Sequence, residues 1–167
     1  MRYVIVATLV YRTLAREPPG LARGSDLYLF LLVAHIAAAI VFIGPATFAS
    51  SAFARFARPS TREVAEALHS VTRTYGNAAL IVPAVGLALA AQRGLFTQGW
   101  LIAATGLFVV AGGLLFGMVV PAQARALDAL QAGADISASL KMRLRLGAGL
   151  FALCWVVVLA LMVMKPF

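Results

Sequence analysis

The stretch LYLFLLVAHIAAAIVFIGPATFASSAFA, residues 27–54, decides the fold. It runs for 28 residues without an Asp, Glu, Lys or Arg. An α-helix rises 1.5 Å per residue, so about 20 apolar residues cross the roughly 30 Å of hydrocarbon in a bilayer. The stretch is therefore long enough to span a membrane as one helix.

Three further stretches share this property. They lack charged residues over 19, 31 and 19 positions, and they cover residues 74–92, 94–124 and 146–164. The whole chain of 167 residues is 62% apolar and only 12% charged, whereas a soluble domain carries about 25% charged residues. The fold class that we predict is all-α, an antiparallel bundle of four transmembrane helices that occupies residues 25–167.

The first 24 residues do not fit this pattern. Their apolar run, residues 3–11, is too short to cross a bilayer and leads to Arg12, Arg16 and a Pro-Pro-Gly break at 18–20. We expect residues 1–24 to form an interfacial helix or mobile arm; a start-site extension without structure and a remnant of a targeting segment are the alternatives.

The positive charges indicate an orientation. The chain holds 14 Lys and Arg against 6 Asp and Glu, a net charge of +8. Eight of these basic residues lie in the first and third loops and six on the opposite side. Under the positive-inside rule, we expect the first and third loops in the cytoplasm and both termini outside, in the inner (plasma) membrane. The bilayer is thus the expected partner, and nucleic acid is not.

Helices 2 to 4 are predicted to extend past the membrane on the cytoplasmic side. Ser60 and Glu63 have the spacing of a capping box, which predicts that helix 2 begins near Thr61. Helix 3 is expected to run until Gly133 stops it, and helix 4 to start at residues 136–137.

Small residues predict where the helices pack, because helices in lipid associate through close backbone approach. Gly86 and Ala90 in helix 2 and Gly147 and Gly149 in helix 4 are candidates for such contacts. Pro45 and Pro83 are expected to kink helices 1 and 2. The main predicted packing positions are four glycines: Gly44, Gly106, Gly113 and Gly117.

His35 is the only histidine or charged residue inside the four stretches. A buried imidazole in lipid needs a hydrogen-bond partner or a metal. One interpretation is a haem or copper ligand or a proton-handling group. The other is a neutral histidine bonded to a backbone carbonyl or a hydroxyl, for which Thr105, at a similar expected depth, is the best side-chain partner.

The remaining residues limit a metal or haem site. His69 lies on the extension of helix 2, about 20 Å from His35, so the two cannot clamp one haem in a monomer. A haem would need His35 with a weak second ligand, or His35 from two protomers. The soft ligands Met118, Met162, Met164 and the single Cys154 form no close pair typical of copper binding. We predict no metal site and no catalytic residues.

Residues 32–44, LVAHIAAAIVFIG, carry a resemblance. The stretch resembles the first helix, H-x6-W-x-G, of a group of small bacterial four-helix integral membrane proteins of unknown function, formerly classed as domains of unknown function. It is similar also to the first helix of the copper resistance protein D family and of the HemJ-type protoporphyrinogen oxidase. Here Phe42 replaces the usual Trp, and Pro45 follows the glycine.

The resemblance implies different things for each relative. In the HemJ type the first-helix histidine is linked to haem, which corresponds to His35, but this chain has no counterpart of that family's further basic residue inside a span. The copper family implies more metal ligands than His35 alone. The uncharacterised family is therefore the better match.

We expect a non-enzymatic membrane protein, either an accessory subunit or a small permease-like module. Its partner would be another membrane protein or a second copy of the chain. The alternative is a haem b-binding membrane protein with His35 as axial ligand.

Overall fold

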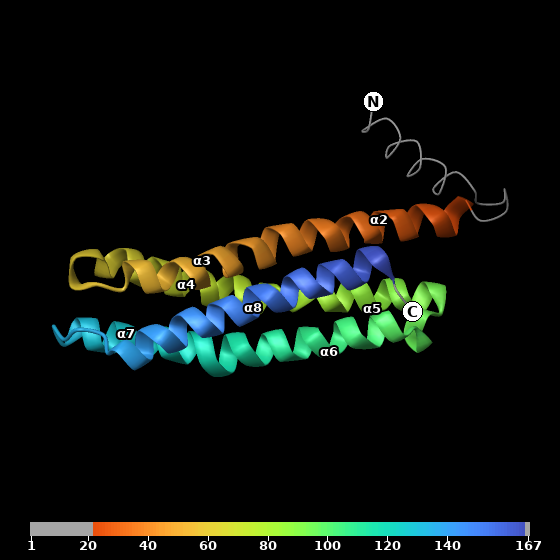
Figure 1. Cartoon of the computed structure of the whole chain (residues 1–167). Coiled ribbons are helices and arrows are strands. Elements are labelled where there is room, and N and C mark those ends of the chain that lie inside the picture. Colours follow the sequence, from red (N-terminus) through yellow and green to blue (C-terminus); the bar gives the residue numbers. More distant parts are fainter. Residues whose placement is uncertain (1–21, 166–167) are drawn as a thin grey trace, which may run out of the picture.

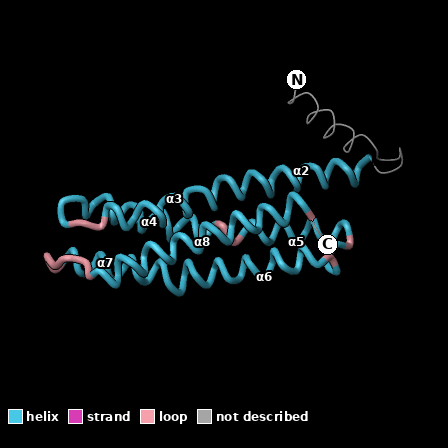
Figure 2. The backbone as a smooth tube through the Cα atoms, viewed as in Figure 1, coloured by secondary structure: helices cyan, strands magenta, loops and turns pink. Residues whose placement is uncertain are grey.

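The computed structural model describes residues 22–165, and in this range the chain folds into four long helices, with no strand (Figures 1 and 2). All four are long and apolar enough to cross a membrane: Asp26–Phe56, Pro59–Arg93, Gly99–Gln131 and Ala138–Met164. We refer to them as spans 1 to 4. The predicted all-α, four-span architecture is confirmed. The expectation for residues 1–24 falls almost wholly outside the described residues.

Three of the four spans are interrupted. Span 1 comprises α2 (Ala22–Ala38), a π-helical segment η1 (Ala39–Ile43) and α3 (Gly44–Phe56). Span 2 comprises a 3₁₀ turn η2 (Pro59–Thr61), α4 (Arg62–Ala78) and α5 (Ile81–Arg93). After a 3₁₀ turn η3 (Leu95–Thr97), span 3 comprises α6 (Gly99–Leu114), a π-helical segment η4 (Leu115–Val119) and α7 (Val120–Gln131). Span 4 is the single helix α8 (Ala138–Met164).

Each interruption comes directly before a proline. Pro45 follows η1, Pro121 follows η4, and Pro83 follows the turn at Ala79 and Leu80. A proline has no N–H to donate, and its ring clashes with the carbonyl four residues earlier, so the preceding turn must widen or break. Irregularity was expected at Pro45 and Pro83. The interruption before Pro121 was not anticipated.

The loop ends of the helices agree with the sequence except at one cap. Span 3 ends at Gln131, with Gly133 at a left-handed φ of 70°, and α8 begins at Ala138, whose preceding Ser137 caps the helix by accepting from the Leu140 amide. The predicted capping box of Ser60 and Glu63 is wrong. The N-cap residue of α4 is Thr61, and its hydroxyl donates to the Phe56 carbonyl at 2.6 Å instead.

The two ends of the bundle pack differently. Towards the first and third loops, α3 packs against α4 and α8, and α4 packs against α7. This end holds the largest buried cluster, which includes Phe53, Leu127 and Leu144. Towards the opposite end, α2 packs against α5, and α6 packs against α8. The chain therefore closes into a four-helix bundle at one end; at the other, α2 with α5 and α6 with α8 are the main contacting pairs, and Ala90 of α5 packs against Trp100 and Leu101 of α6.

Large aromatic side chains join the two pairs. Trp155 of α8 contacts a cluster of Ile43, Ala79 and Val82, and it stacks edge-on against Phe151 with ring centroids 6.1 Å apart. Trp100, near the start of α6, is buried against Ala90 of α5. The middle of the bundle is thus filled by a few bulky side chains, at the level where the spans are interrupted.

Candidate functional site

His35 lies in the last turn of α2 and faces α5. Its Nδ1 lies 2.9 Å from the Val82 carbonyl oxygen. A carbonyl oxygen can only accept, so Nδ1 carries the proton and donates. In the neutral ring this fixes the tautomer and leaves a lone pair on Nε2. The ring is half-buried between the two helices.

Gly86 makes room for this ring. A Cβ built on Gly86 would lie 2.9 Å from His35 Cε1 and 3.4 Å from Nδ1. The first distance is shorter than real Cβ contacts, so any larger residue at position 86 would displace the imidazole. Gly86 and the Val82 carbonyl, one helical turn apart on α5, together hold His35 in place.

Thr105 is not the partner of His35. Its hydroxyl donates to the Leu101 carbonyl of its own helix at 2.8 Å. The expectation assumed that spans 1 and 3 lie side by side at this level, whereas α2 packs against α5 and α6 against α8. Of the two structural alternatives offered by the sequence, a carbonyl or a hydroxyl, His35 uses the carbonyl.

His69 belongs to a separate polar network in the four-helix end. Its Nδ1 donates to Gln123 Oε1 at 3.0 Å, Gln123 Nε2 donates to the Thr72 hydroxyl at 3.3 Å, and that hydroxyl donates to the Leu68 carbonyl. Gln123 and Thr72 are fully buried. His69 lies 13 residues before Val82 along span 2, which corresponds to about 20 Å of helix. The two histidines therefore face different parts of the bundle.

This network was missed from the sequence. The available signal was a glutamine within an apolar stretch, because a buried amide needs several partners. Two other buried polar atoms, Thr47 Oγ1 and Trp155 Nε1, have no hydrogen-bond partner among the described residues.

The four glycines predicted as packing positions make no close contact within the described chain. A Cβ on Gly44, Gly106, Gly113 or Gly117 would meet no atom within 4 Å. The glycines that do allow close approach are Gly76, Gly86 and Gly147, which face Leu115, His35 and Val119 at 2.7, 2.9 and 2.9 Å. The difference has a simple reason: a small residue marks where a backbone can be approached closely, but not which neighbour approaches it.

The open glycines instead form part of the outer surface. Gly106 and Gly113 are seven residues apart, which is two helical turns, and Gly117 follows one turn later. They lie beside Val109 and Val110, which are 66% and 52% exposed. We call this surface of span 3 the outer glycine face.

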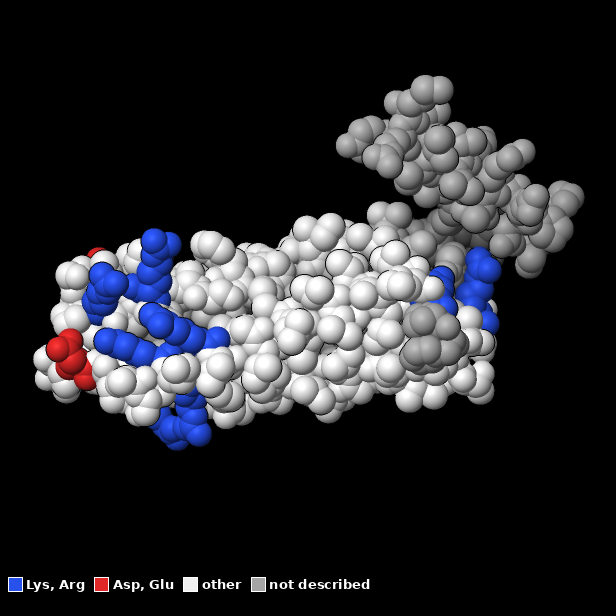
Figure 3. Space-filling model, in the orientation of Figure 1, with Lys and Arg blue, Asp and Glu red and all other residues white. Residues whose placement is uncertain are grey.

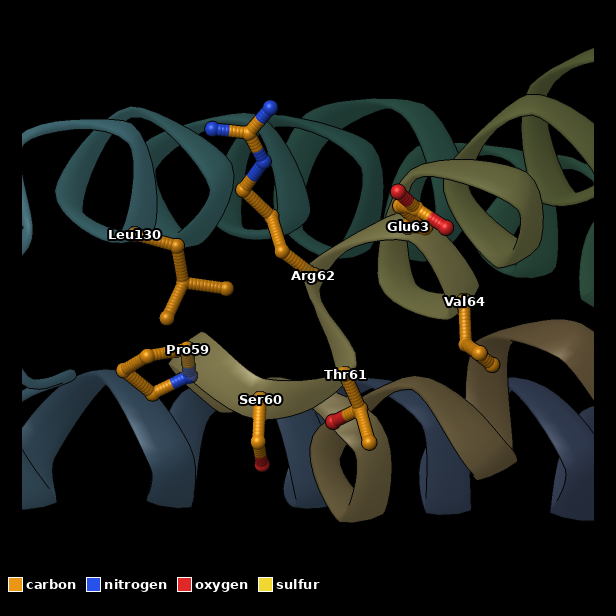
Figure 4. A pocket seen from close by; sticks show the side chains of 7 residues that line it. All are labelled: Pro59, Ser60, Thr61, Arg62, Glu63, Val64 and Leu130. Atoms are coloured by element: carbon orange, nitrogen blue, oxygen red, sulfur yellow. The ribbon is translucent and has the colours of Figure 1, made fainter.

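A shallow pocket of about 440 Å³ lies outside the apolar part of the bundle, where η2 meets α7. Leu130 of α7 points towards Pro59 across it, and the side chains of Ser60 and Thr61 lie at its floor (Figure 4). Within residues 22–165, no three His, Cys, Asp or Glu side chains gather as a metal site would require. The free cysteine, Cys154, is half-buried on α8.

The comparisons with known proteins return one family. The model of a family described as predicted integral membrane protein (DUF2269) matches residues 29–166. No curated protein and no solved structure matches the chain.

Proposed function

Because the chain belongs to the DUF2269 family of predicted integral membrane proteins, we propose that it acts inside the bilayer as a non-enzymatic accessory subunit. In this proposal it binds another membrane protein, or a second copy of itself, through the outer glycine face. A permease-like module is the second form of the proposal, and transport of a solute into vesicles by the protein alone would favour it.

The outer glycine face is the observation that carries the proposal. Small residues let helix backbones approach closely, which is the main source of helix association in lipid. Here a Cβ on Gly106, Gly113 or Gly117 would meet no other part of the described chain within 4 Å, while other glycines serve the internal packing. Placed against a partner helix, they would supply the close contact that they do not make within the bundle.

Span 1 supports the same proposal. Only 6% of its most apolar window is buried, against 22% to 28% for the other three spans. Gly44 is also open on this span, among exposed residues that include Ile40 and Phe48. The most apolar part of span 1 therefore contributes little to the internal core, unlike the buried residues of α3 such as Phe53, and it offers a second surface for contact in the membrane.

Purification from native membranes in a mild detergent tests the proposal. We expect the wild-type protein to retain a stoichiometric partner or to purify as a dimer, and Gly113→Leu to lose it with an unchanged melting temperature. Gly149→Leu is the matched control, since Gly149 is an equally open glycine on α8. A monomeric wild-type protein without a partner, or equal loss in both variants, would contradict the proposal.

Haem b binding by His35 is a second candidate function, favoured by the geometry of its ring. Ligating histidines usually donate their other ring N–H to a carbonyl or carboxylate, which orients the ring. His35 has this arrangement, with Nδ1 bonded to Val82 and Nε2 the remaining donor atom. The chain offers one such ligand, so a second would come from a weak donor or from another protomer. When bound, a haem would supply redox chemistry.

Absorption spectroscopy tests this candidate. A haem protein should show a Soret band on gentle purification, which His35→Ala removes and His69→Ala retains. A colourless protein from haem-replete cells would reject it.

We also propose that the first and third loops face the cytoplasm and that both termini lie outside, in the inner (plasma) membrane. The eight basic residues of those loops support this orientation. Labelling of cysteines introduced as Arg93→Cys and Arg143→Cys in intact cells tests it. We expect position 93 to be labelled from outside, and labelling of position 93 only after lysis would reverse the orientation.

A further inference from the structure

The basic residues at the loop end of the bundle lie in a band next to its apolar surface. Figure 3 shows Lys and Arg side chains gathered beside the uncharged middle of the molecule, with acidic side chains further out, towards the tip. Six exposed residues, which we call the basic collar, carry most of this charge: Arg55, Arg73, Arg125, Lys141, Arg143 and Arg145.

The charges of the collar have no acidic partner in the described part of the chain. The structure gives one ion pair at this end, between Arg62 and Glu66 at 3.1 Å, and it involves no collar residue. At the opposite end, by contrast, Arg93 lies 4.0 Å over the Tyr28 ring and Lys165 lies 5.6 Å over the Trp100 ring. The collar therefore keeps its positive charge available to a partner outside the chain.

The order of residues along α8 indicates which partner this is. Three exposed basic residues lie at the start of α8: Lys141, Arg143 and Arg145. Between and after them lie two exposed apolar residues, Met142 (57% exposed) and Leu146 (53% exposed). Cationic and apolar side chains thus share one short stretch of surface. A headgroup layer, where lipid phosphates adjoin hydrocarbon, matches this mixture, whereas a nucleic acid or an acidic protein would match only the charge.

The helices that carry the collar pack together in the largest buried cluster. Arg73 follows Thr72, and Arg125 lies two residues after Gln123, so the buried hydrogen bonds between Thr72 and Gln123 join the two helices that carry these arginines. Leu144, between Arg143 and Arg145, is fully buried in the cluster shared by α3, α4, α7 and α8. The buried neighbours therefore fix the backbone positions from which the basic side chains extend.

We propose that the basic collar binds the headgroups of anionic phospholipids at the membrane surface. The bond is electrostatic: a lipid phosphate accepts hydrogen bonds from the guanidinium and ammonium groups while its chains lie along the adjoining apolar surface. This inference is independent of the proposed subunit role, because the collar and the outer glycine face occupy different parts of the molecule.

Lipid titration of the whole protein in neutral detergent, followed by native mass spectrometry, tests the proposal. Phosphatidylglycerol is the anionic probe and phosphatidylcholine the zwitterionic one. Each basic group near a lipid surface contributes about 1 kcal/mol, so Arg143→Gln with Arg145→Gln should weaken phosphatidylglycerol binding about 30-fold. Binding should also weaken as salt is raised.

A variant with the same charge change provides the matched control. Arg58→Gln with Arg62→Gln also removes two exposed positive charges at this end, but from the tip. It should alter lipid affinity less than threefold, and the melting temperatures of both variants in detergent verify that they remain folded. Equal weakening by both variants would overturn the proposal, as would equal binding of both lipids or displacement of phosphatidylglycerol by polyglutamate or a short RNA.

Discussion

Substitution of Gly86 by alanine tests how the His35 ring is held. The added Cβ would lie 2.9 Å from His35 Cε1. Overpacking of this kind costs about 1–3 kcal/mol of unfolding free energy. Alanine also favours a helix over glycine by about 1 kcal/mol, which offsets part of the cost. The change in unfolding free energy of Gly86→Ala alone would therefore be ambiguous, because overpacking lowers it and helix propensity raises it.

A double-mutant cycle with His35→Ala removes the ambiguity. In the His35→Ala background, the alanine at position 86 meets no ring, so only its higher helix propensity remains. Gly86→Ala should then raise the unfolding free energy by up to about 1 kcal/mol. The coupling between the two positions should thus be about 1–3 kcal/mol. Reversible unfolding in detergent micelles with increasing dodecyl sulfate, followed by tryptophan fluorescence, measures all four variants.

Gly113→Ala is the matched control for this cycle. A Cβ there meets no atom within 4 Å, so it should show the helix-forming gain alone and no coupling to His35. If the effects of Gly86→Ala and His35→Ala add to within about 0.5 kcal/mol, the ring does not lie against Gly86 and the reasoning is refuted.

Three other substitutions extend the test to the rest of the bundle. Gly147→Ala should lower the unfolding free energy by about 1–3 kcal/mol, because its Cβ would lie 2.9 Å from Val119 Cγ2, while Gly149→Ala should not; equal effects in the same unfolding assay would contradict the packing of α8 on η4. Gln123→Leu should destabilise by about 1–3 kcal/mol, since the ring N–H of His69 then loses its acceptor and the fully buried Thr72 its donor; an unchanged midpoint would show that the network is dispensable. Gly94→Ala should cost about 1 kcal/mol, because residue 94 adopts a left-handed φ of 64°; a stabilised variant would mean that the turn after α5 can rearrange.

The spans and their ends could be predicted because their causes are local. The four stretches without charge fix the membrane helices, and Gly133 and Ser137 mark a helix end and a helix start with their own backbone and hydroxyl chemistry. His35, the only histidine of span 1, could also be singled out from the sequence alone.

The faces and neighbours of the helices could not be predicted, because they depend on the whole bundle. A pattern of small residues marks where a backbone can be approached but not by which neighbour, and the four glycines predicted as packing positions lie on the exposed surface of the described chain. The pairing of α2 with α5 gave His35 the Val82 carbonyl in place of Thr105. Gln123 acquired its role only through two residues of α4, Thr72 and His69, which lie 51 and 54 residues away in sequence.

The claim that the outer glycine face binds a protein partner is tested most directly by photo-crosslinking in native membranes. A photoreactive amino acid at position 109, beside Gly106 and Gly113 and 66% exposed in the monomer, should form an adduct of fixed mass with a second copy or another membrane protein. The same probe at position 156 of α8, 64% exposed, should react with lipid alone. Lipid adducts alone at position 109 would contradict the account.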